Sequence, residues 1–153
     1  MPKQLERLRL DLTDALKSEE AERANTIRGL IASVHNEEIA KRSRGEDSEI
    51  TDEEVVKVLQ KEAKKRKEAI EIYGKAGRAD LEGKEKAELE VISAYIPEEL
   101  SMEEVKKIVD KVLASGETNF GKVMGGAMKE IAGRADASIV SEIVKERLGG
   151  GAE

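Results

Sequence analysis

Apolar residues recur every three or four positions along most of the chain, which is the spacing that places them on one face of an α-helix. The pattern is broken by glycine, proline or polar clusters, so it predicts seven separate helices rather than a few long ones. The predicted helices cover residues 4–17, 18–42, 51 to about 74, a stretch that ends near 95, 101–114, 119–132 and 137–148.

Three helix starts carry residues that suit a helix cap. Thr51 followed by Glu54, and Ser101 followed by Glu104, form capping boxes, in which a hydroxyl and a carboxylate each accept a free backbone amide. Ser18 is expected to cap the second helix, with two glutamates in the first turn, where the helix dipole favours negative charge.

The third helix carries a heptad-like apolar seam that one charged residue interrupts. This residue is Arg66, whose stem can lie along the seam while its charge reaches water. Gly74 and Gly77 are expected to end the helix. Because the fourth helix follows directly, the two should form an antiparallel hairpin. The seam comprises Val56, Leu59, Ala63, Ile70 and Tyr73.

A break near Pro97 divides the predicted helices into two groups, because proline disfavours helical geometry at the preceding Ile96. We therefore predict an all-α protein with an N-terminal four-helix part, residues 1–96, that contains the hairpin. A small three-helix C-terminal module, residues 97–149, follows. The polar stretch 43–50 is expected to be a loop within the first part.

Composition agrees with this fold class and narrows the function. Charged residues make up 39% and aromatic residues 2% of the 153 residues, so the core must be aliphatic. The net charge of −6 argues against a generally basic nucleic-acid-binding surface and leaves only a local basic patch. Cysteine, a membrane-spanning apolar run and a secretion signal are all absent, so we expect a cytoplasmic protein without disulfides.

The tetrapeptide Gly-Arg-Ala-Asp occurs twice, at residues 77–80 and 133–136, each time between two predicted helices. Glycine can adopt the left-handed conformation that ends a helix, and aspartate can cap the next helix. The motif therefore favours a structural corner. We expect Arg134 to be exposed on its corner, and a ligand contact by this arginine is the second interpretation that stays open.

Two groups of basic residues are candidates for a local patch. One lies on the third helix and includes Lys61, Lys64 and Lys65, although a solvated face that aids solubility is the plainer interpretation of such a run. The other group lies in the C-terminal module and comprises Lys122, Lys129, Arg134 and Lys145.

Gly121 and Gly125 lie inside a predicted helix, where each glycine costs roughly 1 kcal/mol relative to alanine. They indicate that another helix or a partner approaches this backbone closely. The single histidine, His35, has Glu38 as its one obvious neighbour, which is too few ligands for a metal site. No acid–base pair, nucleophile or nucleotide-binding loop stands out, so we expect no catalytic residue, no metal and no cofactor.

Several segments spread over the chain combine into a specific pattern. They are residues 36–42, 51–71, 75–91, 95–101, 121–125 and 133–148, together with Arg28. The pattern resembles the GatB/YqeY-like family, specifically its small free-standing YqeY-type members. This resemblance implies a two-part all-helical protein. It also implies that the C-terminal module is similar to the tail of the B subunit of the amidotransferase that corrects misacylated Glu-tRNA or Asp-tRNA, a tail that helps to hold the tRNA.

The resemblance and the basic residues together lead to the hypothesis of a non-catalytic accessory protein that binds tRNA or other RNA. The basic residues of the C-terminal module would contact phosphates, and the third-helix lysines would form a second patch. The alternative is a helical protein-interaction adaptor whose glycine face packs against a partner. Carbon–nitrogen ligase activity with glutamine as amido-N-donor is the least favoured interpretation, because no nucleotide-binding motif or nucleophile is present.

Overall fold

The computed structural model describes residues 1–47 and 49–149, and all regular secondary structure within them is α-helical, which confirms the predicted fold class. Two compact units, Met1–Ile96 and Pro97–Glu153, make up the chain. Among the described residues, each unit has its own cluster of buried, mainly aliphatic side chains.

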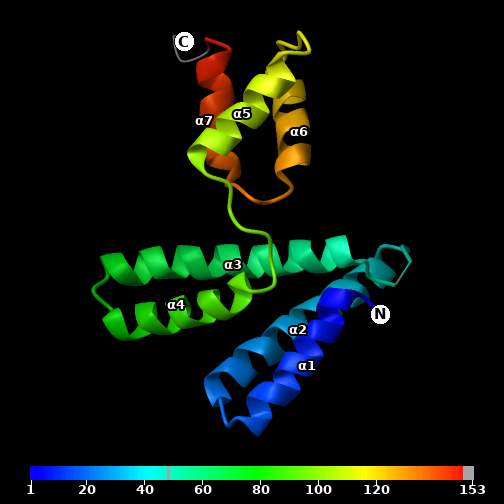
Figure 1. Ribbon diagram of the computed structural model, residues 1–153, viewed down its shortest axis with the longest axis vertical. Coiled ribbons are helices and arrows are strands. Elements are labelled where there is room, and N and C mark those ends of the chain that lie inside the picture. Colours follow the sequence, from blue (N-terminus) through cyan, green and yellow to red (C-terminus); the bar gives the residue numbers. More distant parts are fainter. Residues whose placement is uncertain (48, 150–153) are drawn as a thin grey trace. The chain divides into compact units, whose positions relative to one another are not determined.

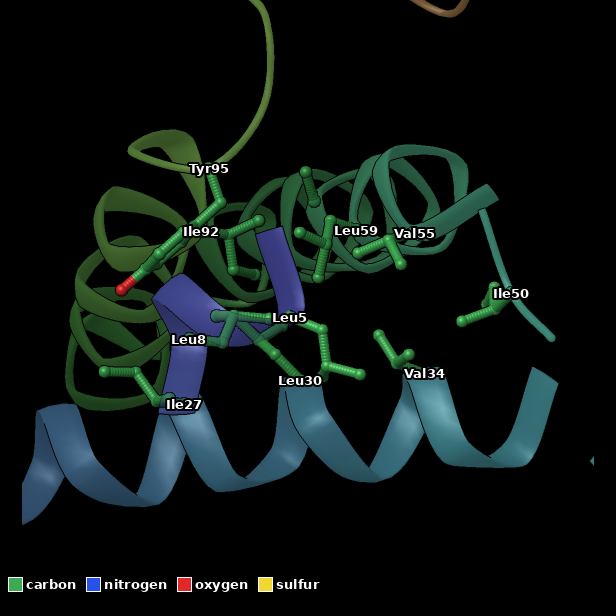
Figure 2. Close-up of a cluster of buried hydrophobic side chains, with 11 residues drawn as sticks. Leu5, Leu8, Ile27, Leu30, Val34, Ile50, Val55, Leu59, Ile92 and Tyr95 are labelled. Carbon is green, nitrogen blue, oxygen red and sulfur yellow. The ribbon is translucent and has the colours of Figure 1, made fainter. Parts of the chain in front are cut away.

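The first unit consists of two helical hairpins. Its helices span Lys3–Lys17 (α1), Ala21–Ser43 (α2), Asp52–Lys75 (α3) and Ala79–Ser93 (α4). Within the unit, α1 lies beside α2, and α3 and α4 form the predicted antiparallel hairpin (Figure 1). Side chains of all four helices meet in the core, where burial of each Leu or Ile contributes roughly 1.5–3 kcal/mol (Figure 2). The core comprises Leu5, Leu8, Ile27, Leu30, Val34, Ile50, Val55, Leu59, Ala63, Ile92 and Tyr95.

The turn between α1 and α2 shows that the capping role predicted for Ser18 is wrong. Ser18 is the C-cap of α1, and the next residue, Glu19, adopts a left-handed φ of 58°. The amide of Glu20 donates to Ala15 O at 2.9 Å and that of Glu19 donates to Leu16 O at 3.3 Å, which is the bond pattern of a Schellman motif. α2 therefore begins after this turn, without a side-chain cap.

The described residues between α2 and α3 form the predicted loop, with two differences in detail. α2 continues one residue further than predicted, and Ile50 is buried in the core. Lys41, which is also buried, donates from Nζ to Glu49 O at 2.8 Å and to Glu54 Oε1 at 2.9 Å. These bonds hold the end of α2 against the start of α3. The bond from Lys41 also lowers the pKa of the Glu54 carboxyl.

α3 begins with the predicted capping box. Thr51 Oγ1 accepts the amide of Glu54 at 3.2 Å, and Glu54 Oε1 accepts the amide of Thr51 at 3.3 Å. The fully buried valine in the first turn is Val55, whereas the predicted Val56 is only half-buried. Val55 lies four positions before the buried Leu59, so the two residues share the inward face of the helix.

Arg66 does not carry its charge to water, in contrast to the prediction for this seam position. Its guanidinium Nη1 lies 2.6 Å from Glu62 Oε2 on α3, and Nη2 lies 3.7 Å from Glu88 Oε1 on α4. The arginine therefore links the two helices of the second hairpin through partly buried carboxylates.

The first Gly-Arg-Ala-Asp corner, residues 77–80, confirms the role predicted for its glycine and contradicts the role predicted for its aspartate. Gly77 has a φ of 70° and directly follows the C-cap of α3, whereas Gly74 lies inside α3. Because α4 already begins at the alanine of the motif, Asp80 comes too late to cap it. The Asp80 carboxylate instead accepts from the Arg78 guanidinium.

The second unit is a three-helix module. Its helices are α5 (Met102–Leu113), α6 (Phe120–Ile131) and α7 (Ala137–Arg147), and each lies within one residue of its predicted bounds at both ends (Figure 1). Ser101 and Glu104 form the predicted capping box at the start of α5. The core comprises Val105, Val109, Val123, Ala127, Ile131, Val140, Ile143 and Val144.

Candidate nucleic-acid interface

α6 turns one face to the core of its module and the opposite face to solvent. Every fourth residue from 123 to 131 is fully buried, whereas Lys122, Gly125 and Lys129 are exposed. Spacings of three and four residues place these three in one row, called the α6 row below, which is about 10 Å long at 1.5 Å per residue. The structure thus brings together two predicted phosphate contacts and one of the glycines predicted to be closely approached.

The charge along the α6 row is entirely positive, because no acidic residue lies between Glu117 and Glu130 in the sequence. Lys122 Nζ lies 3.9 Å from Glu117 Oε1, and 75% of the lysine side chain is exposed. Within the described residues, Lys129 has no salt-bridge partner. Exposed pairs as loose as that of Lys122 contribute little to stability, so both ammonium groups can turn to an anion.

The three glycines of α6 differ in what surrounds them. A Cβ on Gly125 would meet no atom within 4 Å, and a Cβ on Gly121 would meet only its own helix cap, Asn119 Oδ1, at 3.3 Å. A Cβ on Gly126 would lie 3.2 Å from Val112 Cγ1 on α5. The close contact inside the module is therefore made by Gly126. That Gly121 and Gly125 pack against a partner stays a prediction.

In the second Gly-Arg-Ala-Asp corner, residues 133–136, the arginine bonds to the end of the preceding helix. Arg134 is half-buried, not exposed as predicted, and its Nε and Nη2 donate to Ile131 O and Glu130 O, both at 2.8 Å. Both carbonyls lie at the end of α6, and Ile131 O also accepts the backbone amide of Arg134 at 3.1 Å, so the guanidinium adds to the cap of that helix. Asp136 is the N-cap of α7, as predicted, and accepts the amide two residues further on at 3.0 Å.

Lys145 lies on α7, apart from the α6 row. Its Nζ is 5.9 Å from the centroid of the Phe120 ring. Phe120 begins α6, is 40% exposed and is not part of the module's described core cluster. Sequence reasoning missed Phe120, although one signal was present: it is the only aromatic residue in the sequence from 97 to 153.

The lysines of α3 lie in a more balanced environment. Lys61 and Lys64 are exposed, and Lys65 Nζ lies 3.7 Å from Glu62 Oε2. Lys61 and Lys65 also line a hollow of about 220 Å³ between α2 and α3, and the carboxylates of Glu37 and Glu62 line the same hollow. These acids offset the positive charge, so α3 attracts an anion less strongly than the α6 row does.

Two further hollows in the first unit lie beside α4. In the smaller, about 290 Å³, the hydroxyl of Tyr95 donates to Asp11 Oδ2 at 2.5 Å, and the Arg7 guanidinium lies 4.7 Å from the ring centroid. Burial and this bond raise the pKa of Tyr95 to about 12, so the hydroxyl stays protonated near neutral pH and cannot act as a base. The larger hollow, about 620 Å³, lies between α2 and α4 and is lined in part by Gly83 and Ala87.

The described residues show neither a cluster of metal ligands nor a membrane-spanning helix. His35 lies on the surface, with Nδ1 3.2 Å from Glu38 Oε1 as its acidic neighbour, which agrees with the prediction. Within residues 1–47 and 49–149, no three or more His, Cys, Asp or Glu side chains gather as metal ligands would. No helix in this part of the chain combines the length and apolarity needed to cross a bilayer.

Two known proteins are similar to this chain over more than half of its length. It is 34% identical over 151 residues to "Altered inheritance of mitochondria protein 41, mitochondrial" of Pyrenophora tritici-repentis, which covers 95% of this chain and 81% of that protein. It is 34% identical over 94 residues to an uncharacterised protein of Schizosaccharomyces pombe, which covers 61% of this chain and 72% of that protein.

A third relative acts on tRNA according to its name. The chain is 46% identical over 57 residues to the E-type component of the glutamyl-tRNA(Gln) amidotransferase of Aeropyrum pernix, but this covers only 32% of the chain and 9% of that much longer protein. Residues 5–148 match the family described as "Yqey-like protein". Since that match spans nearly the whole chain, the protein belongs to the YqeY-like family and is related to the GatB/YqeY family, as its sequence segments indicated.

Proposed function

We propose that this chain is a non-catalytic accessory protein that binds tRNA or other RNA through the α6 row and Lys145. The observation that carries the proposal is the α6 row, where two exposed lysines flank a glycine whose backbone is open to solvent and no acid lies between them. Family membership and the partial similarity to a component of a tRNA amidotransferase support RNA as the anion.

We assign different roles to the four basic residues of the predicted site. Lys122, Lys129 and Lys145 are exposed and can reach phosphates. Arg134 already uses two donors on the end of α6, so we assign it to positioning that helix end. Three phosphate contacts on a single strand correspond to a log–log salt slope of about −2.

Fluorescence anisotropy with labelled bulk tRNA, measured between about 50 and 200 mM salt, tests the proposal. The double variant Lys122→Gln/Lys129→Gln should weaken binding and make the salt slope less steep by about 1.4. The matched control is Lys106→Gln/Lys107→Gln on α5, which removes the same charge from the same module. Absence of tRNA binding by the native chain at low salt would sink the proposal.

The second patch is tested in the same way. Lys61→Gln/Lys64→Gln on α3 should have a smaller effect than the α6 double variant, because Glu37 and Glu62 already offset the charge on that side of the unit. A larger effect of the α3 variant would move the interface to the first unit.

A protein-interaction adaptor is the second candidate, and the open backbone at Gly125 is the observation that favours it. An apolar helix contact would depend little on salt and little on the flanking lysines.

We do not propose carbon–nitrogen ligase activity. We also propose a cytoplasmic location. The name of the Pyrenophora relative refers to mitochondria, so imaging of the tagged protein in its own cells should distinguish the two locations.

A further inference from the structure

Phe120 is a large apolar side chain that is partly exposed at the start of α6. The other large apolar residues of α6, including Met124 and Met128, belong to the core cluster or pack against it. Phe120 is more exposed than any of these, and 40% of it is accessible at the first position of the helix. The exposed part of its ring therefore offers an aromatic surface to a ligand.

A cation accompanies this exposed ring. Lys145 of α7 places Nζ 5.9 Å from the ring centroid, although no acidic partner holds the lysine there in the described residues. A ring beside an exposed ammonium matches the two parts of a nucleotide, since a base stacks on the aromatic face and its phosphate pairs with the cation.

We propose that Phe120 stacks on an unpaired base of a bound RNA strand and that Lys145 contacts the adjoining phosphate. This inference rests on the proposed RNA-binding function and narrows its ligand to single-stranded segments, such as loops and ends. In a duplex, the faces of the bases are covered by their neighbours, so a side chain on a convex helix end reaches only bases that are splayed out. The α6 row then holds phosphates of either kind of RNA, and Phe120 selects the unpaired one.

Binding of two labelled RNAs tests the selection. One is an unstructured 12-nucleotide strand, and the other is the same sequence in a closed duplex. Phe120→Leu keeps an apolar side chain without the aromatic face, so it should weaken single-strand binding about fivefold to a hundredfold. Duplex binding should change less than about twofold. Lys145→Gln should weaken single-strand binding more than the matched control Lys107→Gln.

The chain contains no tryptophan, so Phe120→Trp introduces a single tryptophan reporter and also keeps the aromatic face if the leucine variant folds poorly. Its fluorescence should be quenched on saturation with the single strand and change little with the duplex. No binding of either RNA by the native chain overturns both the proposed function and this inference. RNA binding that is equally strong in Phe120→Leu, without quenching in Phe120→Trp, overturns the inference alone and leaves the proposed function standing.

Discussion

Replacing Gly125 by alanine should stabilise the second unit and weaken RNA binding at the same time. Gly125 lies inside α6 with ordinary helical geometry, and an added Cβ would meet no atom within 4 Å. The change therefore adds helix propensity without a clash, which is about 0.8–1 kcal/mol in an exposed helix interior. For a unit of this size, such a gain corresponds to a rise in Tm of several degrees.

Urea unfolding followed by circular dichroism at 222 nm measures the gain. Gly126→Ala is the matched control in the same helix, because its Cβ would lie 3.2 Å from Val112 Cγ1 and the strain should offset much of the propensity gain. Gly29→Ala is the control in the first unit. Gly29 lies in α2 with no atom near an added Cβ, so this change should stabilise its own unit and leave RNA binding unaltered.

The RNA affinity of the same variants tests whether a ligand closely approaches the backbone at Gly125. If a strand or a partner lies against the backbone between the two lysines of the α6 row, the methyl group of Gly125→Ala holds it away. Unchanged affinity for both RNA and any partner would refute the close approach inferred from the glycine. A loss of stability in Gly125→Ala would refute the open outward face of α6.

Four other variants test local features of the fold. Glu19→Gly should stabilise the first unit by about 1 kcal/mol in urea unfolding, because glycine takes a φ of 58° without strain. Tyr95 has a raised pKa of about 12, so the stability that it contributes is complete below pH 10 and is lost as the pH rises toward 12. The urea midpoint of the native chain should therefore fall over this pH range. Tyr95→Phe should remove the part of this fall that ionisation of Tyr95 causes. Arg134→Ala should cost about 1 kcal/mol because it removes two side-chain bonds to the end of α6, whereas Arg78→Ala should cost less than about 0.5 kcal/mol because both Arg78 and its partner Asp80 are exposed.

Helices and most of their boundaries could be predicted from the sequence, because the signals are local. The capping box of Thr51 and Glu54 needs only two residues three positions apart, and the structure forms both of its bonds. The apolar period likewise placed α5, α6 and α7, since each helix in this module buries a single stripe. Local rules suffice wherever one residue's role depends only on its near neighbours in sequence.

The errors occur where a rule has two outcomes and the tertiary structure selects one. A serine before two glutamates suits the start of a helix, yet Ser18 ends α1, because Glu19 accepts the left-handed conformation that usually requires glycine. The two Gly-Arg-Ala-Asp copies are identical in sequence, yet only Asp136 is a cap. α4 begins two residues earlier in its copy than α7 does, which leaves Asp80 in the first turn.

The candidate site shows the same limit at the level of side chains. Composition identified the basic residues of the second unit, and helical spacing alone aligns Lys122 with Lys129. Neither composition nor spacing could show that Arg134 turns back onto the end of α6 or that Lys145 lies beside Phe120, because both contacts depend on how separate segments pack.

In α6, the demands of folding and of binding fall on opposite faces. The inward face, with Val123, Ala127 and Ile131 fully buried, is what the core needs, and it would be equally good with alanine at Gly125. The outward face gives up helix propensity at that glycine and places lysines three positions before and four positions after it. A residue that lowers helix propensity, and that makes no contact within the chain to compensate, is expected at a functional position. Because these positions make no core contact, they can be changed one at a time without unfolding the module, so each loss of RNA affinity can be read as a lost contact.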